Sequence, residues 1–118
     1  MEFSIVVAVY NEAGNVRPLL TEISRAVRGT GAREVIYVDD GSEDDTLAEL
    51  RRALPDFPAL RVLHHPRRSG QSGALLTGVR AARAAWVVTL DGDGQNDPAD
   101  IRLLLQRLQD DNALAGDL

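Results

Sequence analysis

The sequence predicts an α/β fold in which a mainly parallel sheet lies between two layers of helices, as a three-layer sandwich. Four short apolar runs are each followed by a segment with helical spacing, so strand and helix alternate along the chain. Strands that alternate with helices imply parallel pairing through right-handed crossovers. The length of 118 residues fits one domain, because domains cluster near about 100–150 residues.

The predicted strands are the four apolar runs, Phe3–Val9, Val35–Val38, Leu60–Leu63 and Trp86–Leu90. The first and the last are rich in valine and end at polar turns. Such short, continuous apolar runs are typical of strands that are buried on both faces.

The first predicted helix follows the first strand. Its apolar residues share one helix face, namely Val16, Leu19, Leu20, Ile23 and Val27. We expect this helix to stop at Gly29 and Gly31. The second helix is predicted before Pro55, and Ser42 and Asp44 offer oxygens for its N-cap. Its apolar face consists of Leu47, Leu50 and Leu54.

Two further helices complete the predicted order. The third should pack through one apolar stripe, made of Leu75, Val79 and Ala82. The fourth should begin near Pro98, since proline is favoured in the first helical turn. Its apolar residues at helical spacing are Ile101, Leu104, Leu105 and Leu108.

Composition excludes several classes of protein. The 13 basic residues are all arginine, against 18 acidic residues, which gives a net charge of −5. Without cysteine there is no disulfide framework, thiolate metal site or cysteine nucleophile. Without lysine there is no Walker lysine and no Schiff base. The acidic balance argues against a nucleic-acid partner, which requires a basic face.

The sequence also bears on the compartment. No apolar run approaches the roughly 20 residues of a membrane span. The start, Met1–Ser4, lacks the basic region of a signal peptide. We therefore expect this chain to be soluble and cytoplasmic.

Polar residues gather where the predicted strands end. These ends carry Tyr10-Asn11-Glu12, Asp39-Asp40-Gly41-Ser42, His64-His65-Pro66-Arg67-Arg68 and Asp91-Gly92-Asp93-Gly94-Gln95. In open α/β sheets, ligands bind beyond the carboxyl ends of the strands, near the point where the strand order reverses. The sequence therefore predicts a binding site built from these four segments.

Asp91 and Asp93 follow a buried strand with one glycine between them. Two carboxylates at this spacing can turn toward one hard cation, and Mg²⁺ binds through one or two carboxylates together with substrate phosphates. An EF-hand loop would need glycine and glutamate where Asn96 and Arg102 stand. A phosphatase with Asp91 as nucleophile and a receiver domain remain alternatives, although both ordinarily employ a lysine. A solvated acidic turn is the other interpretation.

The acidic pair Asp39-Asp40 and the glycine-containing range 67–73 can each be explained by local structure as well as by ligand binding. Asp39 and Asp40 could accept hydrogen bonds from a ribose or a base, or could belong to a helix cap. No G-x-G-x-x-G follows the first strand, which disfavours a dinucleotide site. The glycines in the range 67–73 would let backbone N–H groups approach an anion, and Arg67 or Arg68 could add a guanidinium. His64 and His65 are interpreted as surface residues rather than metal ligands.

Taken together, the four segments resemble glycosyltransferase family 2, whose Rossmann-like domain has the GT-A fold. Val7–Glu12 resembles the first strand of that family and its Y-N-E ending, and Val38–Thr46 matches V-D-D-G-S-x-D-x-T. Gly70–Gly78 resembles its glycine-containing helix start. Leu90–Pro98 resembles D-x-D-x-Q-x-x-P of the branch that transfers sugars to dolichyl or undecaprenyl phosphate. The resemblance covers nearly the whole chain.

The resemblance implies a donor site for a UDP- or GDP-hexose and inversion at the transferred sugar. It places Asp91 and Asp93 on Mg²⁺ or Mn²⁺, and Gln95 near the donor or acceptor phosphate. The segment 10–12, with Asp39 or Asp40, would contact the base and ribose, and Arg68 with the turn after it would lie near the nucleotide or its phosphates. The donor-binding residues that it implies are Val9, Tyr10, Asn11, Glu12, Asp39, Asp40, Gly41, Ser42, Arg68, Gly70, Asp91, Gly92 and Gln95.

Members of this family have a domain of roughly twice this length, so residues 1–118 are expected to form its nucleotide-sugar-binding half. The acceptor site, a catalytic base and any membrane helices would lie in the remainder, and this half alone would be inactive. The longer protein would act at the cytoplasmic face of the inner membrane on a lipid phosphate. The alternative is a non-catalytic assembly module, which self-associates through an exposed sheet edge.

Overall fold

The computed structural model describes residues 2–93, 103, 106 and 107. Its elements follow the order β1 (Phe3–Val9), α1 (Val16–Ala26), β2 (Ala32–Asp40), α2 (Thr46–Ala53), β3 (Leu60–His65), α3 (Gln71–Ala81) and β4 (Trp86–Asp91). Short 3-10 turns at Ala13–Asn15 and Leu54–Asp56 precede α1 and follow α2. The predicted fourth helix, after Pro98, lies outside the described residues.

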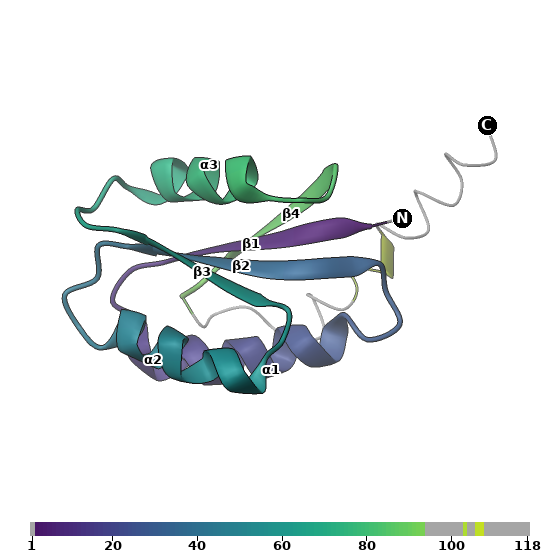
Figure 1. Ribbon diagram of the computed structural model, residues 1–118, viewed down its shortest axis with the longest axis horizontal. Helices are drawn as coiled ribbons and strands as arrows, with labels where there is room; N and C mark the ends of the chain where they lie inside the picture. Colours follow the sequence, from purple (N-terminus) through teal and green to yellow (C-terminus); the bar gives the residue numbers. More distant parts are fainter. Residues whose placement is uncertain (1, 94–102, 104–105, 108–118) are drawn as a thin grey trace.

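The four strands form one parallel sheet in the order β3-β2-β1-β4. Helix α3 covers one face of the sheet, and α1 and α2 cover the other (Figure 1). This arrangement confirms the predicted α/β fold with three layers. Strand β1 lies between β2 and β4. From β1, the sheet is extended on one side by β2 and β3 and on the other side by β4, so the strand order reverses at β1. Ligand sites of open α/β sheets lie at such a reversal of strand order.

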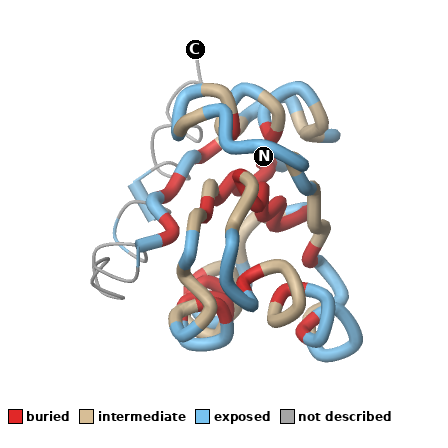
Figure 2. Tube along the Cα trace, turned by 90° about the vertical axis from the view of Figure 1, so that its left-hand side faces the viewer, coloured by how far each residue is buried: buried red, intermediate tan, exposed pale blue. Residues whose placement is uncertain are grey.

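The larger part of the core lies between the sheet and the pair α1 and α2. Four of the five buried residues of α1 belong to the predicted face, namely Val16, Leu19, Leu20 and Ile23, and the fifth is Ala26. Figure 2 shows the buried segments concentrated along the strands and the inner faces of the helices. The predicted face of α1 is therefore confirmed, except that Val27 caps the helix and is partly buried.

Helix α3 packs differently from the predicted stripe. Its buried residues are Ala74 and Gly78, whereas Val79 is 41% exposed. The prediction that Val79 faces the core was wrong. Leu75 and Ala82 of the predicted stripe are partly buried and pack against the core. The small residues Ala74 and Gly78 face the sheet and bring the helix close to it.

Strand β4 lies at one end of the described sheet, with β1 as its neighbour. Trp86 at its start is 56% exposed, and Leu76 on α3 is 48% exposed. The expected self-association through this edge stays a prediction. No helix within the described ranges is both long and apolar enough to traverse a lipid bilayer.

Tyr37 in the centre of β2 yields a prediction about stability. The residue is fully buried, and its hydroxyl has no hydrogen-bond partner in the described part of the chain. Because an unsatisfied buried hydroxyl costs about 1–3 kcal/mol, Tyr37→Phe should leave the free energy of unfolding unchanged or raise it by up to about 1 kcal/mol. Urea unfolding of parent and variant measures this difference. A loss of stability beyond about 1 kcal/mol would show that the hydroxyl is satisfied.

Candidate functional site

A cleft of about 250 Å³ opens at the carboxyl ends of the strands. The residues that line it come from the ends of β1, β2 and β4 and from the start of α3: Ala8, Val9, Tyr10, Glu12, Asp40, Arg68, Gln71, Asp91, Gly92 and Asp93. The segments therefore converge as the sequence predicts, because parallel strands bring their carboxyl ends to one edge of the sheet.

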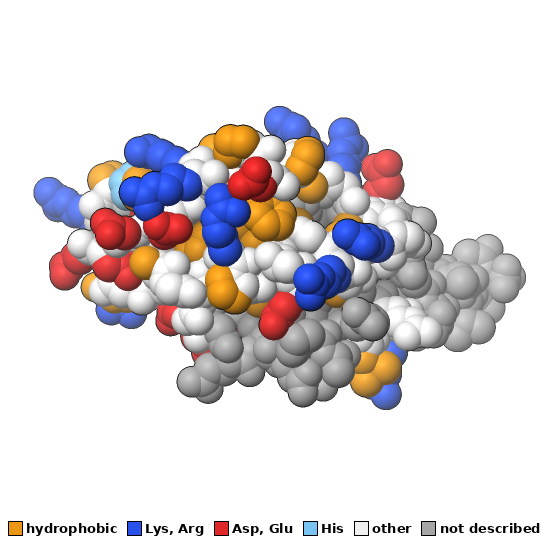
Figure 3. Space-filling model, turned by 90° about the horizontal axis from the view of Figure 1, so that it is seen from below, with side chains coloured by type: hydrophobic (Ala, Val, Ile, Leu, Met, Phe, Trp, Pro, Cys, Tyr) orange, Lys and Arg blue, Asp and Glu red, His pale blue; other side chains and the backbone are white. Residues whose placement is uncertain are grey.

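The charges around the cleft are predominantly negative. Four of its lining residues carry carboxylates, and Arg68 supplies a guanidinium. The guanidinium carbon lies 3.9 Å from the centre of the Tyr10 ring, in a cation–π contact. Figure 3 shows acidic side chains and arginines gathered at the end of the molecule where the strands terminate. An anionic ligand would meet one cation and several carboxylates there.

Gly92 holds the end of β4 against the end of β1. Asp91, the last residue of β4, pairs with Ala8 in the parallel ladder. A Cβ atom at Gly92 would lie 2.6 Å from the Ala8 carbonyl oxygen and 2.3 Å from Cγ1 of Val9. Because no side chain fits at that distance, glycine lets the backbone between Asp91 and Asp93 lie directly on the end of β1.

Asp40 ties the end of β2 to the loop before α3. Its Oδ1 accepts from the Ser69 N–H at 2.8 Å, the Ser69 hydroxyl at 2.9 Å and Nδ1 of His65 at 2.9 Å. Its Oδ2 accepts from the Gly70 N–H at 2.8 Å. Burial opposes ionisation of this carboxyl, but the hydrogen bonds outweigh it and lower its pKa below the ordinary value. Asp40 is therefore held as a carboxylate.

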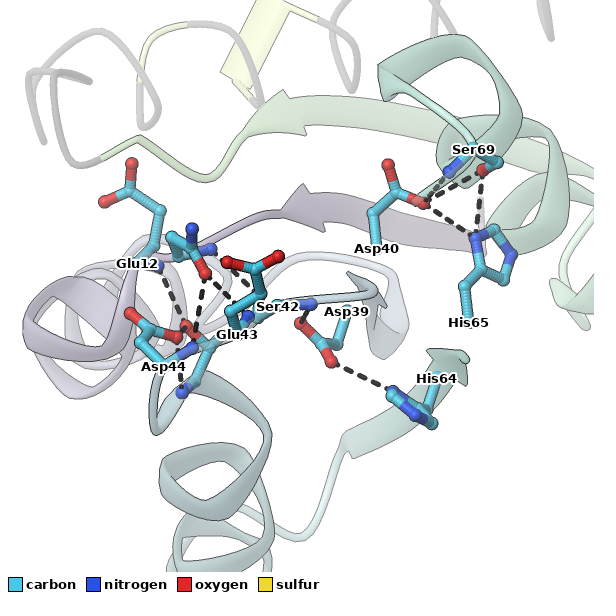
Figure 4. Close-up of polar contacts among 11 residues, drawn as sticks. Glu12, Asp39, Asp40, Ser42, Glu43, Asp44, His64, His65 and Ser69 are labelled. Carbon is cyan, nitrogen blue, oxygen red and sulfur yellow. Dashed lines mark hydrogen bonds and ion pairs between the residues drawn. The ribbon is translucent and has the colours of Figure 1, made fainter. Parts of the chain in front are cut away.

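Ser69, His65 and Asp40 do not form a nucleophilic triad, although they lie together (Figure 4). A triad requires the serine on one imidazole nitrogen and the aspartate on the other. Here Ser69 Oγ lies 3.0 Å from Nδ1 of His65, the same nitrogen that contacts Asp40. The other nitrogen, Nε2, contacts the Thr77 hydroxyl at 2.8 Å. The arrangement fastens β3 and α3 to β2.

Asp39 points away from Asp40, toward a different partner (Figure 4). It is fully buried, contacts Nδ1 of His64 at 2.9 Å and accepts from the Ser42 N–H at 3.3 Å. His64 and His65 each contact an aspartate of the neighbouring strand through Nδ1. His64 is exposed, as its interpretation as a surface residue implies, and His65 is half-buried.

The β1 end is shaped by Asn11, whose φ of 52° is left-handed. Its side-chain oxygen accepts from the N–H groups of Glu43 at 2.8 Å and Asp44 at 3.3 Å. Its own N–H donates to Oγ of Ser42 at 2.9 Å. Asparagine tolerates this backbone conformation better than most residues. The turn fixes the chain between Tyr10 and Glu12, the two neighbours of Asn11 that line the cleft.

Ser42 therefore holds the β1 loop and does not cap α2. The N-cap of α2 is Asp45, whose side chain makes no capping hydrogen bond, so the prediction of Ser42 or Asp44 as N-cap was wrong. Asp44 stands one residue earlier, and its Oδ1 accepts from the N–H of Thr46, the first residue of the helix, at 2.9 Å. Burial again opposes ionisation, and hydrogen bonds from Thr46 and the Ala13 N–H outweigh it, so the pKa of Asp44 lies below its ordinary value.

Gly41 sets the position of Arg68. Its φ of 71° is left-handed, and a Cβ atom there would lie 2.6 Å from the Arg68 nitrogen and 2.8 Å from the Arg67 carbonyl carbon. The backbone of the arginine segment therefore rests directly on this glycine. Arg68 reaches the cleft, whereas Arg67 is not among its lining residues.

The structure divides the predicted donor-binding residues into two groups. Those in the cleft are Val9, Tyr10, Glu12, Asp40, Arg68, Asp91 and Gly92, together with Asp93. Those behind it, in the loops that shape it, are Asn11, Asp39, Gly41, Ser42 and Gly70. Gln95 lies outside the described residues.

Gln71 is the polar residue that the prediction missed. It is the first residue of α3, and its side-chain amide donates to Oδ1 of Asp91 at 2.6 Å. Its position directly after Gly70, within the glycine-containing range 67–73, was a signal. The predicted alternation of strands and helices along the chain could not show that this turn reaches β4.

Asp91 and Asp93 supply hard oxygen donors that fit a divalent cation. Across the residues that the structure describes, no three His, Cys, Asp or Glu side chains are arranged as a metal site by themselves. Two carboxylates are nevertheless the number that Mg²⁺ uses when a substrate phosphate completes its coordination. The donor set therefore fits a cation that is bound together with a diphosphate.

Comparison with known proteins identifies relatives of this chain. It is 39% identical over 111 residues to a dodecaprenyl-phosphate galacturonate synthase of Rhizobium johnstonii, covering 92% of this chain and 33% of the relative. It is 30% identical over 112 residues to dolichol-phosphate mannosyltransferase of Saccharomyces cerevisiae, covering 93% and 42%. The chain thus spans about a third to two fifths of the length of these relatives.

Solved structures share the fold. The mannosyltransferase PcManGT of Pyrobaculum calidifontis, in complex with GDP-Man and Mn²⁺, matches with a TM-score of 0.63 and 31% identity, over 78% of this chain and 27% of that one. TarS of S. aureus, in complex with UDP-GlcNAc, matches with a TM-score of 0.66 and 26% identity, over 79% and 27%. The sequence pattern described as glycosyl transferase family 2 matches residues 4–117. The chain therefore belongs to glycosyl transferase family 2.

Proposed function

We propose that this chain forms the nucleotide-sugar-binding half of a GT-A domain, in an enzyme that transfers a sugar to a polyprenyl phosphate with inversion. The observation that carries the proposal is the convergence of Asp91 and Asp93 with Tyr10 and Arg68 in one cleft. The relatives named as polyprenyl-phosphate sugar transferases support the acceptor class. The neighbours solved with GDP-Man and UDP-GlcNAc support the donor class.

In this proposal the residues of the chain bind and orient the donor. The Tyr10 ring and the guanidinium stacked on it offer a flat face and a positive charge to the nucleotide. Asp91 and Asp93 would hold Mg²⁺ or Mn²⁺, which supplies Lewis-acid stabilisation of the leaving nucleoside diphosphate when it is bound. The excess of carboxylates in the cleft repels a diphosphate, and a bound cation would offset this repulsion.

We also propose that donor binding and catalysis are divided between two parts of the longer enzyme. The acceptor site and the catalytic base belong to parts of the longer enzyme outside residues 1–118. This half then binds the donor and does not turn it over by itself. The longer enzyme works at the cytoplasmic face of the inner membrane, where its lipid-phosphate acceptor is embedded.

Nucleotide titration tests the donor site. Calorimetry with UDP and GDP should show binding that Mn²⁺ strengthens, because the cation bridges the carboxylates and the diphosphate. Asp91→Ala and Asp93→Ala should each remove the Mn²⁺-dependent gain, at least about tenfold in affinity. The exposed Asp45, which lies outside the cleft, supplies the control Asp45→Ala with parental affinity. A folded chain that binds neither nucleotide with Mn²⁺ would refute the proposal.

A further inference from the structure

The start of α3 connects β2 to β4 across the end of the strand between them. On one side, the Ser69 and Gly70 N–H groups donate to Asp40 at the end of β2. On the other side, the next residue, Gln71, donates from Nε2 to Oδ1 of Asp91 at 2.6 Å. The sheet order places β1 between these two strands. Residues 69–71 thus link the Asp40 side chain to the Asp91 side chain through hydrogen bonds.

The loop is held firmly at the Asp40 end. The Asp40 side chain is 4% exposed and takes hydrogen bonds from two successive backbone N–H groups as well as from the Ser69 hydroxyl. Gly70, with a φ of 93°, then turns the chain into the first residue of α3. The backbone of Gln71 is therefore placed by Asp40 and not only by its own helix.

The Gln71 side chain reaches the cleft from this fixed backbone. Both Gln71 and Asp91 are exposed residues that line the cleft. An exposed aspartate samples several rotamers, and a hydrogen bond to one oxygen restricts that rotation. A carboxamide does this without neutralising the carboxylate, whereas a lysine or arginine at the same place would repel a cation bound to it.

We propose that Gln71 is a positioning residue that orients the carboxylate of Asp91 for a divalent cation, and that Asp40 sets the position of Gln71. This inference rests on the proposed function, because it takes Asp91 as a ligand of the cation. It assigns Gln71 no contact with the reacting atoms. Groups that orient metal ligands in this way change metal affinity by about 10–100-fold when they are removed.

The test measures Mn²⁺ affinity by electron paramagnetic resonance, with saturating UDP or GDP. Gln71→Ala removes the donor and should weaken Mn²⁺ binding about tenfold. Gln71→Lys keeps a donor at this position but adds a positive charge, so it should weaken Mn²⁺ binding further than alanine does. Ser72→Ala changes the neighbouring exposed residue of the same turn and should bind Mn²⁺ as the parent does.

A purely structural role would give a different pattern. Loss of local structure would weaken nucleotide binding without metal as well, and it would affect alanine and lysine alike. We expect instead that Gln71→Ala weakens Mn²⁺ binding more than it weakens metal-free nucleotide binding, and that Gln71→Lys, whose charge attracts the phosphates, binds metal-free nucleotide more tightly than Gln71→Ala does. Urea midpoints of both variants within experimental error of the parent establish that they are folded.

The outcomes separate this inference from the proposed function. If Asp91→Ala loses Mn²⁺ while Gln71→Ala and Gln71→Lys retain parental affinity, the positioning role is wrong and the proposed donor site stands. If Asp91→Ala retains parental Mn²⁺ affinity, the proposed metal site is wrong and the inference is overturned with it. If Mn²⁺ affinity decreases from the parent to Gln71→Ala and further to Gln71→Lys, the result supports both the proposed metal site and the positioning role of Gln71.

Discussion

Asp40→Ala is expected to lower the free energy of unfolding by about 3–5 kcal/mol, the usual cost of removing one partner from a buried charged network. The Asp40 side chain is 4% exposed and accepts from two N–H groups, one hydroxyl and one imidazole nitrogen. Without the carboxylate, the N–H groups of Ser69 and Gly70 lose their acceptor at a partly buried position. Urea unfolding at neutral pH, followed by circular dichroism, measures the loss.

Asp45→Ala is the matched control for this prediction. Asp45 is exposed and its side chain makes no capping hydrogen bond with α2. Its replacement should change stability by no more than about 0.5 kcal/mol, as is usual at surface positions. Equal unfolding midpoints for the Asp40 and Asp45 variants would contradict a structural role for the Asp40 network.

Glu34→Ala should have a second large effect, about 3 kcal/mol, at the opposite end of the sheet. Glu34 is 4% exposed in its side chain and forms an ion pair with Arg61 at 2.5 Å. It also accepts from the Ser4 hydroxyl and from the Arg83 N–H, each at 2.6 Å. Because Arg83 precedes β4, the carboxylate fastens the entry to that strand onto β1 and β2. Chemical unfolding measures the loss, and Glu43→Ala, at an exposed position, is the control.

The contribution of Glu34 should also depend on pH with a defined sign. Burial opposes its ionisation, but the hydrogen bonds from Ser4, Arg83 and Arg61, with the Arg61 charge, outweigh burial and lower its pKa below the ordinary 4.5. A lowered pKa in the folded state adds stability that is present above the pKa of the unfolded chain and is lost as pH falls through the folded value. The difference between parent and Glu34→Gln should therefore be constant from pH 7 to about 5 and shrink toward about pH 3. A difference that grows on acidification would contradict this assignment.

Strands β1 and β2 were predictable because burial on both faces leaves a continuous apolar run. The expectation that the run Trp86–Leu90 is buried on both faces was wrong, since Trp86 and Thr89 of β4 are exposed. Strand β2 shows the limit of that signal, since it extends over Ala32–Asp40 and not only Val35–Val38. Glu34, Asp39 and Asp40 occupy strand positions with buried side chains. Their partners come from other elements, and a local pattern of apolar residues does not reveal a polar strand residue that is satisfied from elsewhere.

The sequence was sufficient to predict which segments meet at the candidate site, but not which side chains touch. Parallel strands bring their carboxyl ends together, so Tyr10, Asp40 and Asp91 had to share one edge. Which side chains touch depends on the strand order and on how closely each helix approaches the sheet. The contact between Gln71 and Asp91 requires that α3 packs through Ala74 and Gly78, which helical spacing of large apolar residues did not indicate.

The central place of β1 also determines when the site can exist during folding. Its ladder with β4 pairs Phe3 with Trp86 and Ala8 with Asp91, residues from opposite ends of the described range. Such long-range parallel pairing is slow to form, because the entropy of a long loop is lost before the contacts between the two strands can stabilise the pair. During synthesis on the ribosome, one edge of β1 therefore stays unpaired until β4 has been made. When β4 pairs with β1, the same step places Asp91 in the cleft. The single tryptophan of the chain, Trp86, begins this strand, and it pairs with Phe3 once the strand has docked.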